Sequence, residues 1–167
     1  MGPFGLLLCV ILFAVGSSQL DYEFDHGIGS IATKRPLVIG HRGASGVYPE
    51  HSEAAYKQAI HDGADAIECD VVLTRDSIPI CNHDLGLAHT TNIESKPEFA
   101  DRKRKYPELG LDIEDFYSFD FDLAEIKTLR RIQPLASRDP SFNDNFSVVT
   151  FTEYIDIAKS AARPVAI

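Results

Sequence analysis

The chain has few basic side chains for its number of acidic ones. Its 167 residues include 16 lysines and arginines against 25 aspartates and glutamates, which gives a net charge of −9 and a sequence pI near 5.0. Because a nucleic-acid backbone demands a basic protein surface, this balance argues against DNA or RNA as a partner. The only basic cluster, residues 102–105, is predicted to be a solvated loop rather than an anion-binding site.

Long apolar runs are absent after the first sixteen residues. Residues 1–15 contain no charged side chain, and Ala14-Val15-Gly16 places small residues where a signal peptidase cuts. The run is too short to span a bilayer comfortably. We therefore predict a signal peptide over residues 1–16, a secreted mature chain destined for the extracellular space, cell wall or vacuole, and no stable membrane insertion of that chain.

Cysteine is also scarce. The sequence has three cysteines, of which Cys9 falls in the predicted signal peptide, so Cys69 and Cys81 remain. Secretion would permit a disulfide between them. Side chains alternate along a strand, however, so Cys69 should point away from the face used by Glu68 and Asp70. We expect free thiols and keep the disulfide as the alternative.

The chain beyond residue 16 has the length of one domain. A polar segment over residues 17–36 precedes a folded part over residues 37–167, which contains an insertion at about 75–148. Neither an internal repeat nor a low-complexity tract is present. Asn145-Phe146-Ser147 is an N-glycosylation sequon in a polar loop, so Asn145 is a candidate glycan acceptor.

The part before the insertion is predicted to form a strand, a helix and a second strand. Residues 37–40 are an apolar run ending in glycine, Ser52 can cap a helix that stops at Gly63, and residues 64–73 return as the second strand. This order indicates a βαβ unit with a parallel strand pair. The next connection is too short for a helix, so residues 78–82 should fold back as a hairpin.

Two further helices are predicted from apolar spacing. One begins at a capping pair, Asp122 with Glu125, inside the otherwise polar and irregular insertion. The other covers about residues 152–162 with Thr152 as its cap, and residues 164–167 then open another strand. The residues expected to face inward are Ile126, Leu129 and Ile132 on the first helix and Tyr154, Ile155 and Ala158 on the second.

Glu68 and Asp70 lie two residues apart on the second predicted strand. Their carboxylates should therefore project to the same face, about 7 Å apart at their Cα atoms, and can share one hard cation. A solvent-facing acidic edge is the other reading, but the apolar neighbours of the pair indicate a buried strand. We predict metal ligation, and oxygen ligands favour Mg²⁺ or Ca²⁺, with secretion favouring Ca²⁺.

Two histidines each follow an apolar run. His41 ends the first predicted strand and His83 ends the hairpin. A pair of imidazoles can divide the work of phosphoryl transfer, one accepting the nucleophile's proton and the other protonating the leaving oxygen. We predict that His41 and His83 are catalytic. The histidines without such a setting are expected at the surface, namely His26, His51, His61 and His89.

Arg42 offers a planar guanidinium that suits the oxygens of a phosphate. Gly43 beside it allows close approach of the backbone. An ion pair between Arg42 and Glu50 is the structural alternative, and the two roles are compatible. Thr90 and Thr91 either orient the loop of His83 or form a turn.

These residues belong to an ordered series of short motifs. The series resembles the glycerophosphodiester phosphodiesterase family, specifically its secreted, plant-type branch. Any single motif would be a weak signal, whereas the ordered set is a strong one. The motifs are His41-Arg42-Gly43-Ala44, Tyr48-Pro49-Glu50, Gly63-Ala64-Asp65, Glu68-Cys69-Asp70-Val71, Thr74-Arg75-Asp76, Pro79-Ile80 and His83-Asp84.

The resemblance implies an α/β fold, a (β/α)8 TIM barrel with a small insertion after the second strand. It also implies hydrolysis of small glycerophosphodiesters such as glycerophosphocholine to glycerol 3-phosphate and an alcohol. By this likeness His41 and His83 are the acid/base pair, Glu68 and Asp70 bind a divalent cation, Ca²⁺ or Mg²⁺, and Arg42 contacts the phosphate.

The sequence departs from the family pattern in three ways. His51-Ser52 stands where members usually carry Asn-Thr, and Ala88-His89 where they carry Asp-Arg, which bears on substrate choice more than on chemistry. The family's third metal carboxylate is expected beyond Ile167, and a complete barrel takes about 250 residues. We therefore expect an incomplete barrel of two to three β/α units with little or no activity alone. The alternative is a non-catalytic secreted remnant or binding protein of the same fold.

Overall fold

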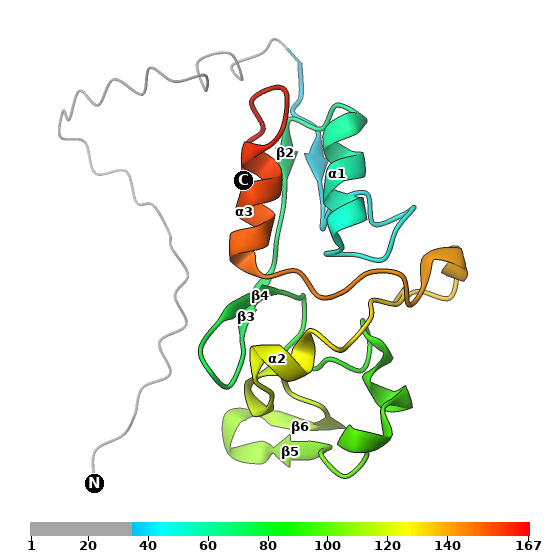
Figure 1. Cartoon of the computed structure of the whole chain (residues 1–167), viewed down its shortest axis with the longest axis vertical. Helices are drawn as coiled ribbons and strands as arrows, with labels where there is room; N and C mark the ends of the chain where they lie inside the picture. Colours follow the sequence, from blue (N-terminus) through cyan, green and yellow to red (C-terminus); the bar gives the residue numbers. More distant parts are fainter. Residues whose placement is uncertain (1–34) are drawn as a thin grey trace, which may run out of the picture.

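The computed structural model describes residues 35–167 (Figure 1). The predicted signal peptide, residues 17–34 of the polar segment, Cys9 and His26 lie outside the described residues. Within residues 35–167 no helix is long and apolar enough to cross a membrane.

The predicted strand, helix and strand order is confirmed. Strand β1 (Ile39–Gly40) pairs in parallel with β2 (Ala66–Ile67), and helix α1 (Glu53–His61) connects them. The Ser52 hydroxyl accepts a hydrogen bond from the Ala55 amide at 3.1 Å, as the capping pattern predicts. Both strands are shorter than the apolar runs that contain them.

A third segment joins this sheet on the other side of β2. Ala166 forms a parallel bridge with Ala66, and the Ile67 amide donates to the Ala166 carbonyl at 3.0 Å. The strand expected over residues 164–167 is thus represented by a single bridge. The described residues form an α/β structure without a closed barrel, consistent with part of a TIM barrel.

The predicted second strand divides into two. Strand β3 (Val71–Leu73) is antiparallel to β4 (Pro79–Cys81), which confirms the hairpin, but residues 68–70 between β2 and β3 belong to neither strand. The Glu68 amide still donates to Gly40 on β1, whereas the Asp70 carbonyl accepts from Asn82 after β4. The chain therefore changes partners at residues 68–70, and the expectation of one continuous strand was wrong.

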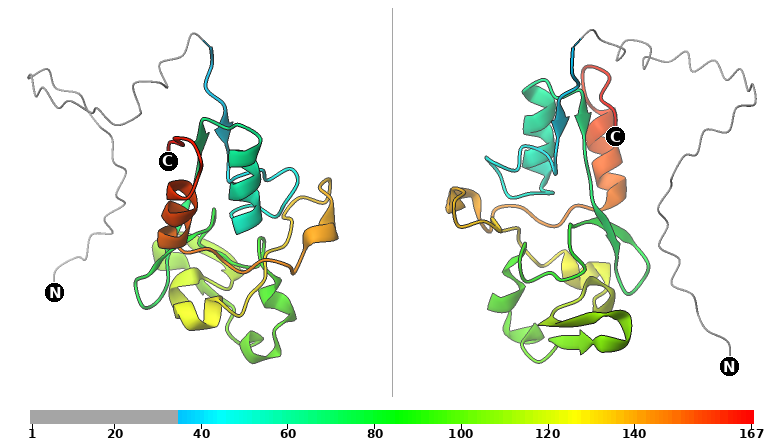
Figure 2. Two further views of the ribbon diagram at one scale, coloured as in Figure 1. Left: turned by 45° about the horizontal axis from the view of Figure 1, so that its top comes forward. Right: turned by 180° about the vertical axis from the view of Figure 1, so that it is seen from behind.

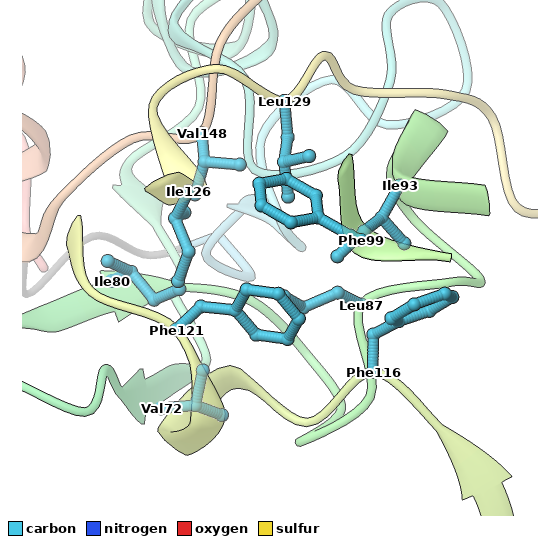
Figure 3. Close-up of a cluster of buried hydrophobic side chains, with 10 residues drawn as sticks. All are labelled: Val72, Ile80, Leu87, Ile93, Phe99, Phe116, Phe121, Ile126, Leu129 and Val148. Carbon is cyan, nitrogen blue, oxygen red and sulfur yellow. The ribbon is translucent and has the colours of Figure 1, made fainter. Parts of the chain in front are cut away.

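The insertion is less irregular than predicted because it contains its own apolar cluster (Figure 3). Strands β5 (Arg104–Tyr106) and β6 (Leu111–Asp115) form an unpredicted antiparallel hairpin. Short 3-10 helices supply most of the remaining turns: η2 (Asn92–Ser95), η3 (Pro97–Phe99), η4 (Pro107–Leu109), η5 (Ser118–Asp120) and η6 (Pro140–Phe142). The buried cluster comprises Val72, Ile80, Leu87, Ile93, Phe99, Phe116, Phe121, Ile126, Leu129 and Val148.

Helix α2 (Leu123–Ile126) begins at the predicted Asp122 and Glu125 capping box but lasts one turn only. Leu129 is nevertheless fully buried, because the chain after the helix folds back onto the cluster. Ile132 is half-buried and also lies beyond the helix. The helical spacing thus identified a core residue, Leu129, while overestimating the length of the helix.

The basic cluster is only in part the predicted solvated loop, because Arg104 and Lys105 are exposed but lie on strand β5, while Arg102 and Lys103 are half-buried. The Arg102 guanidinium lies 3.9 Å from the centroid of the Phe121 ring and donates to Glu125 at 2.6 Å. Lys103 pairs with Glu94 at 2.5 Å, and Arg104 belongs to strand β5. Arg102 and Lys103 thus lie over aromatic rings, Arg102 over Phe99 and Phe121 and Lys103 over Phe116.

Helix α3 (Phe151–Lys159) packs against α1 and β4 (Figure 2). Its cap is Thr150, which forms a capping box with Glu153, so the prediction of Thr152 was wrong by two residues. Tyr154 is buried as expected and donates its hydroxyl to the Ile67 carbonyl at 2.7 Å. Ile157 completes the buried face, while Ile155 and Ala158 are half-buried.

Candidate active site

The turn that follows β1 places the first candidate residues. Arg42 and Gly43 both have left-handed backbone conformations, with φ of 60° and 79°. A Cβ on Gly43 would lie 2.6 Å from the Ala55 carbonyl carbon, so only glycine fits there. This conformation directs the Arg42 amide at Glu68, whose Oε2 accepts from it at 2.9 Å.

The Arg42 side chain contacts two other carboxylates. Its Nη1 donates to Glu50 Oε1 at 2.9 Å, and its Nε lies 3.3 Å from Asp70 Oδ2. Arg138 approaches the other oxygen of Glu50 at 3.5 Å. The Arg42–Glu50 ion pair expected as the structural alternative is therefore present. Arg42 thus joins both predicted metal carboxylates, through its amide for Glu68 and its side chain for Asp70.

The two predicted catalytic histidines line one pocket of about 330 Å³. Their side chains are 69% and 42% exposed, so both rings are accessible from this pocket. His41 Nε2 lies 4.0 Å from Glu68 Oε2, and His83 Nδ1 lies 2.9 Å from Asp84 Oδ1. The remaining lining residues are Arg42, Glu50, Asp84, His89, Pro134, Leu135 and Arg138.

The lining of this pocket contains hydrogen-bond donors that an anion could use. Two guanidinium groups and three imidazoles face it against two carboxylates. A second pocket of about 490 Å³ shares His83 and Asp84 with the first. It is lined further by Asp112, Asp115 and Tyr117, and no lysine or arginine lines it. The second pocket is therefore acidic, whereas arginines balance the carboxylates in the first.

His51 was predicted at the surface, and this prediction is wrong because the residue is fully buried. Its Nδ1 lies 2.7 Å from the Tyr56 hydroxyl and its Nε2 lies 3.3 Å from Asp70 Oδ2. Burial lowers the pKa of His51 to about 2, with the charges of Arg131 and Arg42 acting in the same direction. A neutral imidazole thus lies between a phenol and a predicted metal ligand.

The signal for His51 in the sequence was its place directly after Pro49-Glu50, where the family pattern has asparagine. His61 and His89 are exposed as predicted, although His89 also lines the pocket of His83. Arg138 has no signal in the sequence, because it lies in an irregular segment of the insertion.

A family model for the glycerophosphoryl diester phosphodiesterases matches residues 41–165. The chain belongs to this family. It is 44% identical, over 97% of its length, to the glycerophosphodiester phosphodiesterase GDPD6 of Arabidopsis thaliana, and it covers 45% of that protein. The same organism's glycerophosphodiester phosphodiesterase GDPDL3 is 36% identical over 87% of the chain, which covers 20% of GDPDL3.

Solved structures of bacterial phosphodiesterases share the fold. One from Oleispira antarctica, in complex with the product sn-glycerol-3-phosphate, aligns with a TM-score of 0.55 at 23% identity over 84% of this chain and 45% of its own. A glycerophosphodiester phosphodiesterase from Agrobacterium tumefaciens aligns with a TM-score of 0.52 at 24% identity, over 77% of this chain and 45% of its own. The chain thus spans less than half the length of these relatives.

Glycerophosphodiester phosphodiesterases generally act with a divalent cation. In this chain Glu68 and Asp70 offer hard oxygen ligands, and Asp70 Oδ2 is a nearly buried atom without a hydrogen-bond partner among the described residues. No group of three histidines, cysteines or acidic residues within residues 35–167 is arranged to hold a metal ion. Each carboxylate is therefore of the kind that Mg²⁺ takes, one or two at a time, beside substrate phosphate.

The two cysteines of the folded part are free thiols. Cys69 Sγ donates to the Asp70 carbonyl at 3.2 Å, and Cys81 is fully buried.

Thr90 and Thr91 take one each of the two roles considered for them, contact with the His83 loop and formation of a turn. Thr90 donates to Asn82, the residue before His83, at 2.8 Å, whereas Thr91 donates to the Leu87 carbonyl within a turn.

Proposed function

We propose that the protein takes part in metal-dependent hydrolysis of glycerophosphodiesters such as glycerophosphocholine, giving glycerol 3-phosphate and an alcohol. The observation that carries this proposal is one pocket lined by His41, Arg42 and His83, with Glu68 hydrogen-bonded to the Arg42 amide. Family membership supplies the reaction class.

The chain's own groups support acid/base chemistry in this pocket. One imidazole accepts the proton of the nucleophile, which is water or the substrate's own hydroxyl, and the other protonates the leaving oxygen. Asp84 Oδ1 lies 2.9 Å from His83 Nδ1, so this carboxylate is placed to orient the ring. Arg42 and Arg138 face the phosphate. A divalent cation, Ca²⁺ or Mg²⁺, held by Glu68 and Asp70 would neutralise charge on the phosphate oxygens.

The second pocket supports a cationic alcohol as the leaving group. It adjoins the first through His83 and Asp84 and adds the carboxylates of Asp112 and Asp115. Glycerophosphocholine has its positive charge next to the phosphate, so the two pockets match the two charges of this substrate in order. The proposal of glycerophosphocholine as a substrate rests on this arrangement and on the family.

The proposal is tested by measuring hydrolysis of glycerophosphocholine by two proteins, the 167-residue chain and a chimera. In the chimera, residues 1–167 replace the matching segment of Arabidopsis GDPD6. We expect turnover by the chimera with Ca²⁺ or Mg²⁺, none after chelation, and slower turnover of glycerophosphoglycerol, whose alcohol is neutral. For the chain alone we expect little or none, because no group of three side chains within residues 35–167 is arranged to hold a metal ion.

An inactive chimera that still folds would refute the enzymatic proposal. It would favour the second candidate function, a non-catalytic binding protein of the same fold. The observation that favours a non-catalytic role is that Arg42 is already paired with Glu50 and Asp70. Strong activity of the chain alone would contradict the expectation of an incomplete metal shell.

We also propose that the chain enters the secretory pathway and carries a glycan on Asn145. Asn145 and Ser147 of the sequon are both exposed, and the sequence of residues 1–16 supplies the export signal. Expression in a eukaryotic secretory host is expected to give a mass increase that peptide N-glycosidase removes and that Asn145→Gln abolishes. Secreted protein of unmodified mass would contradict the glycan, and retention in the cytosol would contradict export.

A further inference from the structure

A fully buried arginine lies behind the loop that carries His83. Arg131 is 0% exposed, and no aspartate or glutamate among the described residues pairs with it. Its Nη1 donates to Asn82 Oδ1 at 2.6 Å and also reaches Thr90 Oγ1 at 3.2 Å, while its Nη2 donates to the Cys81 carbonyl. Its three contacts are therefore neutral oxygens on the strand and loop around His83.

Such a residue is costly for the stability of the fold. Removing a guanidinium from water costs several kcal/mol, and an apolar side chain of similar size in the same place is often neutral or stabilising. Burial accordingly lowers the pKa of Arg131 from its ordinary value. The contacts that Arg131 makes have to offset this cost, and one of them is its hydrogen bond to Asn82.

Asn82 is also fully buried, and every polar group of its side chain is used. Its Oδ1 accepts from Arg131 and Thr90, and its Nδ2 donates to the Asp84 carbonyl at 2.6 Å. Its backbone amide donates to the Asp70 carbonyl at 3.0 Å. Asn82 therefore holds the loop beyond His83 and also the segment that carries the predicted metal ligand.

We propose that Arg131 is a positioning residue that fixes His83 through Asn82 and Thr90. Resting on the proposed function, this inference adds a residue that lines neither pocket but acts on the site through His83. Arg131 donates to the carbonyl of Cys81, and Asn82 donates to the carbonyl of Asp84. The backbone is therefore held on both sides of His83. The planar fork of arginine reaches these acceptors simultaneously, which the single ammonium group of lysine does not do.

The ring resonances of His83 in the 167-residue chain test the proposal by nuclear magnetic resonance, with His83→Gln for assignment. Thr90→Val removes the hydroxyl, Thr90→Ser keeps it, and Arg131→Lys keeps the charge without the fork. Arg130→Met is the matched control, because Arg130 is the adjacent arginine and its side chain contacts only the carbonyls of residues 127 and 129. Thermal unfolding identifies which variants are folded.

We expect the His83 resonance to shift or broaden in Thr90→Val and Arg131→Lys and to match wild type in Thr90→Ser and Arg130→Met. In the chimera with Arabidopsis GDPD6, Arg131→Lys is expected to lower kcat on the order of 10²-fold with KM little changed, the size of effect that misplacing a catalytic group produces. Should Arg131→Lys not fold, the Thr90 pair decides the question.

A His83 resonance at its wild-type position in folded Thr90→Val and Arg131→Lys would overturn the proposal, as would an unchanged kcat in folded Arg131→Lys. The resonances are independent of turnover. If His83→Ala retained full activity in the chimera, the proposed function would fail, whereas the positioning of His83 would still be judged by its spectrum.

Discussion

Replacing His83 with alanine in the chimera is expected to lower kcat/KM for glycerophosphocholine by about 10²- to 10⁴-fold, the usual contribution of general acid/base catalysis. His41→Ala should have an effect of the same order. Both rings line the pocket with Arg42 and are exposed to it, so removing an imidazole leaves the phosphate-facing groups in place. The loss should therefore appear mainly in kcat, with KM little changed.

The matched control is His61→Ala. His61 is an exposed histidine at the end of α1, whose contact is with its neighbour Asp62. It should leave kcat and KM as they are. The double variant of His41 and His83 should lose little more than either single variant, because the two rings serve one reaction and such losses are not additive. Near-normal rates in both single variants would show that the acid/base assignment is wrong.

Glu68→Gln and Asp70→Asn in the same chimera are expected to raise the Ca²⁺ or Mg²⁺ concentration needed for half-maximal activity by at least about tenfold. Loss of mere outer partners of metal ligands already costs about 10- to 100-fold in affinity. Glu68→Gln retains an oxygen that can accept from the Arg42 amide, so the turn after β1 should stay intact. The measurements are activity against metal concentration and calorimetric titration of the free protein with each ion.

Asp62→Asn is the control for loss of a charge. Asp62 is exposed at the end of α1, and its side chain contacts His61 and Gln58, not Arg42. It should leave the metal response unchanged. An unaltered response in both Glu68→Gln and Asp70→Asn would remove these residues from the metal site. A loss of unfolding temperature that matched the loss of activity would assign them to the fold instead.

The sequence was sufficient where a local rule decides the structure. Ser52 before α1 and the Asp122 and Glu125 pair before α2 fulfil their capping patterns, because a cap depends on residues only three positions apart. The same rule was misapplied at α3. The prediction of Thr152 as the cap is wrong because Thr150 has glutamate three residues later, and the observed capping box follows that spacing.

The predictions failed where distant contacts decide. The apolar run over residues 64–73 gives no sign that its pairing changes from β1 to β4 at residues 68–70. Apolar residues of the insertion, such as Leu87, Ile93 and Phe99, follow neither a period of two nor one of 3.6, so their shared cluster was invisible to periodicity. The buried His51 was missed because its partners, Tyr56 and Asp70, are recognisable only once α1 is folded against the sheet.

That His41, Arg42 and His83 lie near one another was therefore predictable, but the contacts of these residues were not. His41 and Arg42 at the end of β1 and His83 after the hairpin line one pocket. The involvement of Arg131 and Arg138 was not predictable, because arginine in an irregular polar segment is ordinarily a solvated residue. Their position depends on how the insertion folds back over the hairpin of β3 and β4.

The hydrogen bond from the Arg42 amide to Glu68 separates two tasks that one residue performs. Every amino acid except proline carries an amide N–H, so the carboxylate can stay anchored whatever side chain occupies position 42. The left-handed backbone there is one that glycine, asparagine and aspartate adopt most readily, and Arg42 adopts it too. A substitution that this backbone accepts would therefore change the side chain facing the pocket while keeping the amide hydrogen bond to Glu68.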